Sequence, residues 1–110
     1  MRAVFGCVVV AFALSVAGLS MAQDKAAAGM KVFEAQKCGM CHAVAGKGNK
    51  KAPLDGVGKK LNEAQIKEWI VDPKTAAEKA KSTAKPPMKA YPNLPAADLD
   101  SLVAYMSSLK

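Results

Sequence analysis

The chain has 110 residues, 51% of them hydrophobic but only 5% aromatic, and its 16 lysine and arginine residues outnumber nine acidic ones, for a formal net charge of +7. A chain of this length forms one domain, which excludes a multidomain organisation. The excess of lysine favours partners with acidic surfaces, and the scarcity of aromatic residues predicts a thin hydrophobic core.

The N-terminal segment has the layout of a secretory signal peptide. A basic Arg2 precedes an apolar run over residues 3–19, and small residues up to Ala22 suit cleavage after that position. We therefore predict that residues 1–22 are a cleaved signal peptide, that residues 23–110 form the mature domain, and that the protein is exported to the periplasm. An uncleaved membrane anchor is the alternative, because the apolar run is close to spanning length.

The mature domain contains two cysteines, Cys38 and Cys41, and keeps every acidic residue while it loses one positive charge with Arg2. A disulfide between these cysteines would close a very small loop and contribute little stability, so we do not expect them to form a structural disulfide. With so few aromatic side chains the domain is marginal by itself, and a large apolar cofactor would supplement its core.

Four helices and no convincing strand are predicted in the mature domain. The first covers residues 24–37, with Asp24 as its N-cap and with Met30 and Phe33 near one apolar face. Gly29 lies inside this helix, where glycine costs about 1 kcal/mol relative to alanine. A close crossing of two helices would explain the glycine.

Residues 43–60 are rich in glycine and lysine and are predicted to form a loop. A second helix is predicted over residues 61–72. Asn62 and Gln65 have the spacing of a capping box at its start, which would satisfy backbone N–H groups in the first turn.

A short third helix is predicted over residues 72–82, with Asp72 as its cap and Pro73 at its first position. Residues 83–95 contain four prolines and are predicted to be an extended loop. The last helix is predicted over residues 96–110. Its apolar face consists of Leu99, Leu102, Val103, Met106 and Leu109.

The stretch KCGMCHAVAGKG, residues 37–48, contains Cys38, Cys41 and His42, the chain's single histidine. A thioredoxin-like dithiol also uses C-x-x-C, but normally near a βαβ pattern, and this chain shows no strand periodicity. A structural zinc site needs four ligands, and the mature domain offers two cysteines and one histidine. C-x-x-C-H is also the signal for covalent attachment of a c-type haem. This third interpretation agrees best with export and with a small helical chain.

Cysteines three positions apart on a helical turn lie on one side, so each can form a thioether with one vinyl group of the haem. The adjacent His42 then directs its imidazole at the iron. Met88 is the predicted sixth ligand, because its proline-stiffened loop, KPPMKAYP, can reach the opposite face of the haem. Met30 and Met106 suit helix faces, and Met40 is held away from the iron by its neighbours. Ligation by histidine and methionine raises the reduction potential and suits electron transfer.

The stretches GMKVFEAQKCGMCHAVAG, APLDGVG, PPMKAYPNL and DLDSLVAYMSSL resemble a small bacterial class I cytochrome c, and the resemblance covers nearly all of residues 24–110. It implies an all-α cytochrome c fold with about four short helices wrapped around one covalently bound haem. It assigns Cys38 and Cys41 as the thioether cysteines, His42 as the proximal ligand and Met88 as the distal ligand.

The resemblance also implies supporting roles. Pro53 would offer its carbonyl to the ligating histidine, a contact that orients the ring and tunes the iron. Trp69 would form an aromatic wall of the haem pocket, where its indole N–H could hydrogen-bond a propionate. Gly29 and Phe33 would cross the C-terminal helix near Leu102 and Tyr105.

Together these features predict a periplasmic, monomeric electron-transfer protein with one haem c and no catalytic residues. Its partners would carry acidic patches, as on an oxidase, a dehydrogenase or a cytochrome complex. We do not expect it to bind nucleic acid. We expect it to contact a membrane only if residues 1–22 are retained. The lysines expected to steer such partners are Lys37, Lys47, Lys50, Lys51, Lys85 and Lys89. The alternatives are a haem subunit of a dehydrogenase complex, or a haem enzyme or sensor with a displaceable sixth ligand.

Overall fold

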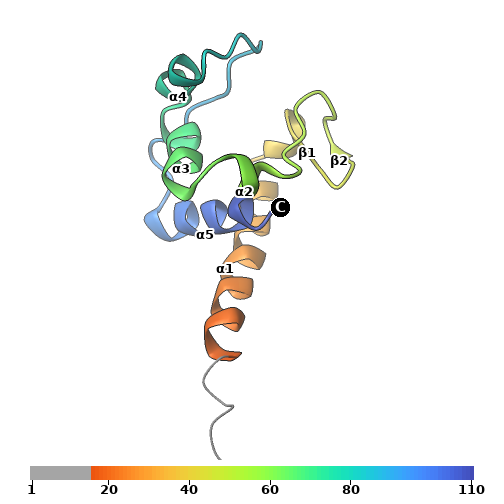
Figure 1. Cartoon of the computed structure of the whole chain (residues 1–110), viewed down its shortest axis with the longest axis vertical. Coiled ribbons are helices and arrows are strands. Elements are labelled where there is room, and N and C mark those ends of the chain that lie inside the picture. The colour runs from red at the N-terminus through yellow and green to blue at the C-terminus, as the bar shows by residue number, and fades with distance from the viewer. Residues whose placement is uncertain (1–15) are drawn as a thin grey trace, which may run out of the picture.

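The computed structural model describes residues 16–110 and shows a mostly helical domain (Figure 1). α5 lies across α1, and α3 and α4 lie on the side away from the start of α1. The predicted all-α class is confirmed, with five α-helices in the described residues where about four were expected. In chain order the elements are α1 (Val16–Ala35), η1 (Cys38–Met40), β1 (Ala43–Val44), β2 (Lys47–Gly48), α2 (Val57–Lys60), α3 (Glu63–Val71), α4 (Pro73–Ala80) and α5 (Ala96–Ser107).

The crossing of α1 and α5 is centred on the buried Gly29. A Cβ atom at this position would overlap with the carbonyl oxygen of Ser101 and lie 2.7 Å from the Cβ of Tyr105. One turn later the rings of Phe33 and Tyr105 meet edge to face, with centroids 5.8 Å apart and planes at 75°, a favourable aromatic geometry. The close crossing that Gly29 predicted is therefore confirmed.

The hydrophobic core forms where α1, α3 and α5 meet. The predicted apolar face of α5 is confirmed, with Leu109 half-buried at its edge. Burial of these side chains is the main term that stabilises α5, because its N-cap residue, Pro95, makes no side-chain hydrogen bond. The buried members of this cluster are Phe33, Ile66, Ile70, Leu99, Leu102, Val103, Tyr105 and Met106.

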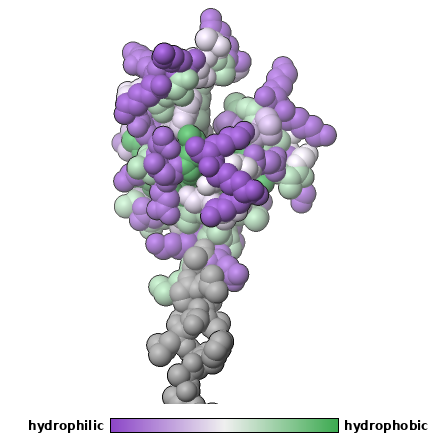
Figure 2. Space-filling model, viewed as in Figure 1, coloured by the Kyte–Doolittle hydropathy of each residue, from purple (hydrophilic) through white to green (hydrophobic). Residues whose placement is uncertain are grey.

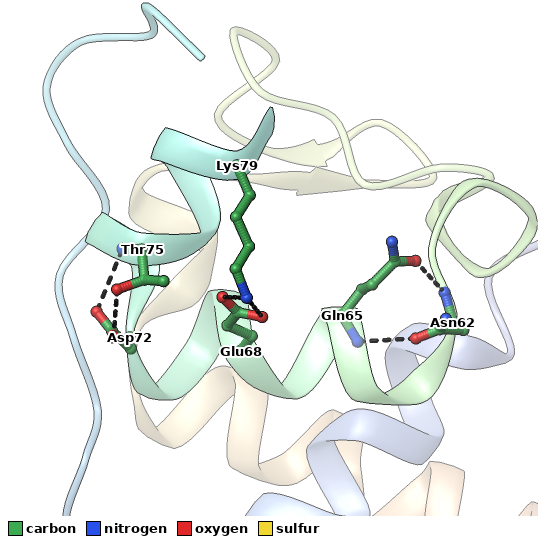
Figure 3. Close-up of polar contacts among 6 residues, drawn as sticks. All are labelled: Asn62, Gln65, Glu68, Asp72, Thr75 and Lys79. Atoms are coloured by element: carbon green, nitrogen blue, oxygen red, sulfur yellow. Dashed lines mark hydrogen bonds and ion pairs between the residues drawn. The ribbon is translucent and has the colours of Figure 1, made fainter. Parts of the chain in front are cut away.

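Side-chain caps fix the starts of α3 and α4 (Figure 3). Asn62 Oδ1 accepts a hydrogen bond from the Gln65 N–H, and Gln65 Oε1 accepts one from the Asn62 N–H, each 2.9 Å long. The predicted capping box is therefore confirmed. Asp72 accepts hydrogen bonds from the side chain and backbone of Thr75, which lower the pKa of its carboxyl group. Pro73 follows as the first residue of α4, as predicted.

The first helix is longer than predicted. α1 begins at Val16 and continues through residue 24, so the prediction of an N-cap at Asp24 is wrong. Four of the seven residues from 22 to 28 are alanines, which have the highest helix propensity and carry the helix past the acidic residue. The helix ends at Ala35, and Lys37 adopts a left-handed conformation with φ 56°.

The glycine- and lysine-rich segment before α3 is more ordered than the predicted loop. β1 and β2 pair in antiparallel fashion around Ala45 and Gly46, which have φ values of 51° and 80°, and Asp55 Oδ1 accepts a 2.9 Å hydrogen bond from the Ala45 N–H. α2 lies against the end of α5, where the Gly58 N–H donates to the Leu109 carbonyl over 2.8 Å. Strands of two residues are too short to produce an alternating pattern, and so the expectation of no strand was wrong here.

Within residues 16–110, no helix combines the length and apolar character needed to cross a membrane. Residues 1–15, most of the predicted signal peptide, lie outside the described residues. Cleavage after Ala22, the boundary of the mature domain and the alternative of a retained anchor therefore stay predictions.

Replacing Gly29 with alanine tests the helix crossing. The added methyl group would overlap with the Ser101 carbonyl, so we expect Gly29→Ala to lower the free energy of unfolding by about 1–3 kcal/mol. Urea unfolding followed by far-ultraviolet circular dichroism measures this change.

Alanine is the better helix former by about 1 kcal/mol, so a crossing looser than described would let Gly29→Ala stabilise the protein, and that result would contradict the packing. The control is Met30→Ala, at a neighbouring position that is 47% exposed. Its effect should stay within about 0.5 kcal/mol.

Candidate functional site

A large cavity opens beside the core, with a volume of about 1040 Å³. This is large for a small-molecule site and suits a bulky cofactor. Core side chains line it, among them Phe33, Ile66 and Leu102. Figure 2 shows a largely hydrophilic surface on one face of the molecule, with apolar side chains visible between the polar ones.

Five of the six predicted site residues line this cavity: Cys38, Cys41, His42, Trp69 and Met88. They come from three separate parts of the chain, namely η1 with the residues after it, α3, and the loop between α4 and α5. The fold therefore brings together side chains that are far apart in sequence. The sixth, Pro53, is exposed.

The turn at η1 presents the two cysteines. The carbonyl of Cys38 accepts hydrogen bonds from the N–H groups of Cys41, at 3.1 Å, and His42, at 2.9 Å, so the three residues are held in one compact turn. Cys38 is half-buried, Cys41 is exposed and neither forms a disulfide. Burial raises the pKa of the Cys38 thiol above its ordinary value. Both sulfurs are therefore free for covalent attachment of a ligand.

A backbone carbonyl orients the imidazole of His42. The Nδ1 atom lies 3.0 Å from the carbonyl oxygen of Ala52. A carbonyl can only accept, so in this contact Nδ1 carries the proton, and in the neutral ring Nε2 keeps its lone pair. A hydrogen bond at one ring nitrogen, which leaves the other free, is the usual arrangement of a metal-binding histidine.

The backbone carbonyl that accepts the hydrogen bond of His42 belongs to Ala52 and not, as predicted, to Pro53. The Ala43 N–H donates to the Ala52 carbonyl, at 3.4 Å, and the Leu54 N–H donates to the Ala43 carbonyl, at 2.8 Å, which forms a short parallel bridge between Ala43 and Pro53. Successive carbonyls of an extended chain point to opposite sides. The register of this bridge therefore turns the Ala52 carbonyl toward His42, and the carbonyl after it points elsewhere.

Met88 enters the cavity from a loop that is anchored at its two ends. The Ser82 N–H donates to the Ala77 carbonyl, and the Tyr91 N–H donates to the Ile70 carbonyl, both over 2.9 Å. Burial raises the pKa of the Tyr91 hydroxyl, so the hydroxyl stays neutral and donates to the Gln36 carbonyl over 3.3 Å. Tyr91 therefore ties the methionine loop to both α3 and the end of α1.

α3 and α4 form another wall of the cavity. The half-buried Trp69 lines the cavity from α3. An ion pair between Lys79 Nζ and Glu68 Oε1, 2.9 Å apart, joins α4 to α3 (Figure 3). Because Lys79 is largely exposed, we expect this ion pair to contribute little to the free energy of unfolding.

Positive charge gathers around the cavity. Six lysines line it, whereas only two acidic residues of the described chain, Asp72 and Glu78, do so. Lys47 and Lys50, also expected to steer partners, are exposed in and just after β2. The lysines that line the cavity are Lys37, Lys51, Lys74, Lys81, Lys85 and Lys89, all with exposed side chains. This arrangement favours an approaching negative surface.

The groups on this cavity fit a c-type haem. Two free thiols, an imidazole with an available Nε2 and a thioether sulfur lie on one largely apolar cavity, which is the donor set that tethered haem iron uses. In residues 16–110 no three His, Cys, Asp or Glu side chains are grouped so as to hold a metal ion.

Sequence analysis missed two residues of the site, Ala52 and Asn49. Ala52 acts through its backbone carbonyl, and no residue type signals that role. Asn49 is flanked by glycine and lysine, a composition typical of any surface turn. It contacts the turn of residues 38–42, called the attachment turn from here on, because the fold brings residue 49 back to residues 39–42.

Comparison with known proteins agrees with this site. The family model for Cytochrome c matches residues 26–110. A curated relative, cytochrome c oxidase subunit 2 from Alkalihalophilus pseudofirmus (strain ATCC BAA-2126 / JCM 17055 / OF4), is 32% identical over 91 residues, which cover 74% of this chain and 25% of the relative. The chain therefore spans about a quarter of the length of that relative. No solved structure shows a significant match.

Removing the Tyr91 hydroxyl tests the anchoring of the methionine loop. Tyr91→Phe leaves the Gln36 carbonyl without this donor, so we expect a loss of about 1 kcal/mol in the free energy of unfolding and faster exchange of the residue 91 amide, which donates to the Ile70 carbonyl, measured by hydrogen–deuterium exchange. Tyr105→Phe is the matched control, because among the described residues the Tyr105 hydroxyl has no hydrogen-bond partner. Equal exchange of the residue 91 amide in both variants would contradict the anchoring role.

Proposed function

This chain belongs to the cytochrome c family, and we propose on that premise that it is an exported carrier of single electrons, with one c-type haem held in the cavity between His42 and Met88. The family implies haem-based electron transfer on a covalently bound haem. One observation carries the finer proposal: two free cysteines, an oriented imidazole and a methionine from a separate loop line the same apolar cavity.

Each residue has a defined part in this proposal. Cys38 and Cys41 would hold the haem through thioethers, and His42 Nε2 and the sulfur of Met88 would bind its iron. When bound, the haem supplies the redox chemistry, at a potential that methionine ligation raises. The Ala52 carbonyl keeps the imidazole in one tautomer and orientation. The largely apolar lining would keep water away from a bound haem, so little would have to rearrange when an electron is transferred.

The proposed partners are redox proteins with acidic docking patches. The exposed lysines around the cavity would raise the rate of encounter with such surfaces. The relative's name identifies it as an oxidase subunit, which supports an oxidase as one class of redox partner. A dehydrogenase or a cytochrome complex is the other class that we propose. We propose a periplasmic monomer that carries electrons and performs no catalysis itself, with membrane contact only if its N-terminal segment is retained.

A spectrum of methionine variants tests the proposed function. Ferric wild-type protein should show a methionine–iron charge-transfer band, and Met88→Ala should abolish it and lower the reduction potential, because the sulfur ligand is lost. Met40→Ala is the matched control: its side chain is 71% exposed and lies between the two tethers, so this variant should keep the band. A wild-type spectrum without the band would instead favour a haem enzyme or sensor with an open iron position.

The salt dependence of electron transfer tests the docking proposal. The rate to an acidic partner should fall as the ionic strength rises, because the screening length shortens from about 10 Å at 0.1 M to about 3 Å at 1 M salt. Replacing Lys85 and Lys89 together with glutamine should slow transfer more than the same replacement of Lys25 and Lys31, which lie on α1. Equal effects of the two double variants would show that the lysines around the cavity have no special part in docking.

A further inference from the structure

Asn49 lies directly against the turn formed by residues 38–42. Its backbone N–H faces the carbonyl oxygens of Gly39, at 3.0 Å, and His42, at 3.2 Å. Its side-chain Nδ2 donates to the carbonyl of Met40 over 3.1 Å. Three carbonyls of the attachment turn therefore find donors on this single residue.

The other end of the same side chain reaches the segment that orients the histidine. Asn49 Oδ1 accepts a 3.0 Å hydrogen bond from the Lys51 N–H. Lys51 immediately precedes Ala52, whose carbonyl faces His42 Nδ1. The side-chain amide of Asn49 thus links the attachment turn to the residue next to the histidine's hydrogen-bond partner.

Gly48 shows how closely these two segments approach. It has φ +104°, and a Cβ atom there would overlap with the carbonyl oxygen of His42 and lie 3.0 Å from that of Gly39. Only glycine combines this backbone conformation with the space available. The hydrogen bonds of Asn49 therefore belong to a tight backbone contact, which limits the positions open to the residues that follow it.

We propose that Asn49 is a positioning residue for His42: by joining the turn of residues 38–42 to Lys51, it holds the Ala52 carbonyl where it can accept the Nδ1 proton. This inference rests on the proposed function, because it concerns how the imidazole is presented to haem iron. A strong hydrogen bond at Nδ1 makes Nε2 more basic, and a more basic ligand favours ferric iron. Weakening that bond is therefore expected to raise the reduction potential.

The test uses haem-loaded Asn49→Ala, which removes the contacts to Met40 and Lys51 but keeps the backbone donor. In the ferrous protein, exchange of the His42 Nδ1 proton, followed by nuclear magnetic resonance, should become about tenfold faster. The reason is that the variant loses a hydrogen bond that holds the Ala52 carbonyl against Nδ1. The reduction potential should rise. Asn62→Ala is the matched control: it removes the cap of α3 and lowers stability, but it should leave both the exchange and the potential unchanged.

A second variant decides the matter if Asn49→Ala does not yield folded haem protein. Asn49→Asp has the same shape, keeps the acceptor for the Lys51 N–H and loses the donor to Met40, so the Nδ1 proton should again exchange faster than in the wild type. The inference would be overturned if the His42 Nδ1 proton exchanged at the wild-type rate in either folded variant of Asn49, or if Asn62→Ala accelerated this exchange equally. A wild-type protein whose mass shows no bound haem would instead contradict the proposed function, which keeps the two failures distinct.

Discussion

The close approach of Gly29 to the Ser101 carbonyl sets the geometry on which the site depends. Because α1 can lie directly on α5 there, Phe33 packs against Tyr105. α1 then ends beside the core, and the chain turns at once into η1, where Cys38 packs against the same cluster. A larger side chain at residue 29 would separate the helices, and the attachment turn would lose its place at the cavity.

The two sides of the cavity are built differently. The histidine side is a network of hydrogen bonds among the attachment turn, Asn49 and Ala52. The methionine side is a proline-containing loop, and in the described structure no backbone–backbone hydrogen bond ties residues 83–90 to the rest of the domain. Proline restricts such a loop without hydrogen bonds, while Tyr91 fixes its end. The fold therefore supports one side through backbone contacts and the other through chain stiffness and anchors at the two ends of the loop.

The sequence predicts those features that short-range chemistry controls. The capping box of Asn62 and Gln65, the start of α4 at Pro73 and the apolar face of α5 follow from local spacing, and all three are present. Gly29 also predicted the close crossing of α1 and α5, because glycine is unfavourable inside a helix and a close contact between helices would explain it.

What escaped prediction depends on contacts between distant segments. The hairpin of β1 and β2 and the short α2 are too brief to leave a periodic pattern. The choice of Ala52 over Pro53 as the partner of His42 follows from the register of a bridge with Ala43, and neither residue type reveals it. Residues with reactive side chains could be found from the motif, whereas residues that act through the backbone required the fold.

A crystal structure of the isolated protein, with the iron located by its anomalous scattering, tests the central claim most directly. We predict one iron atom in the cavity, bound by His42 Nε2 on one side and by the sulfur of Met88 on the other, with both cysteine sulfurs bonded to the haem. An iron atom without the Met88 sulfur as its ligand, or a cavity that holds no iron, would contradict this account.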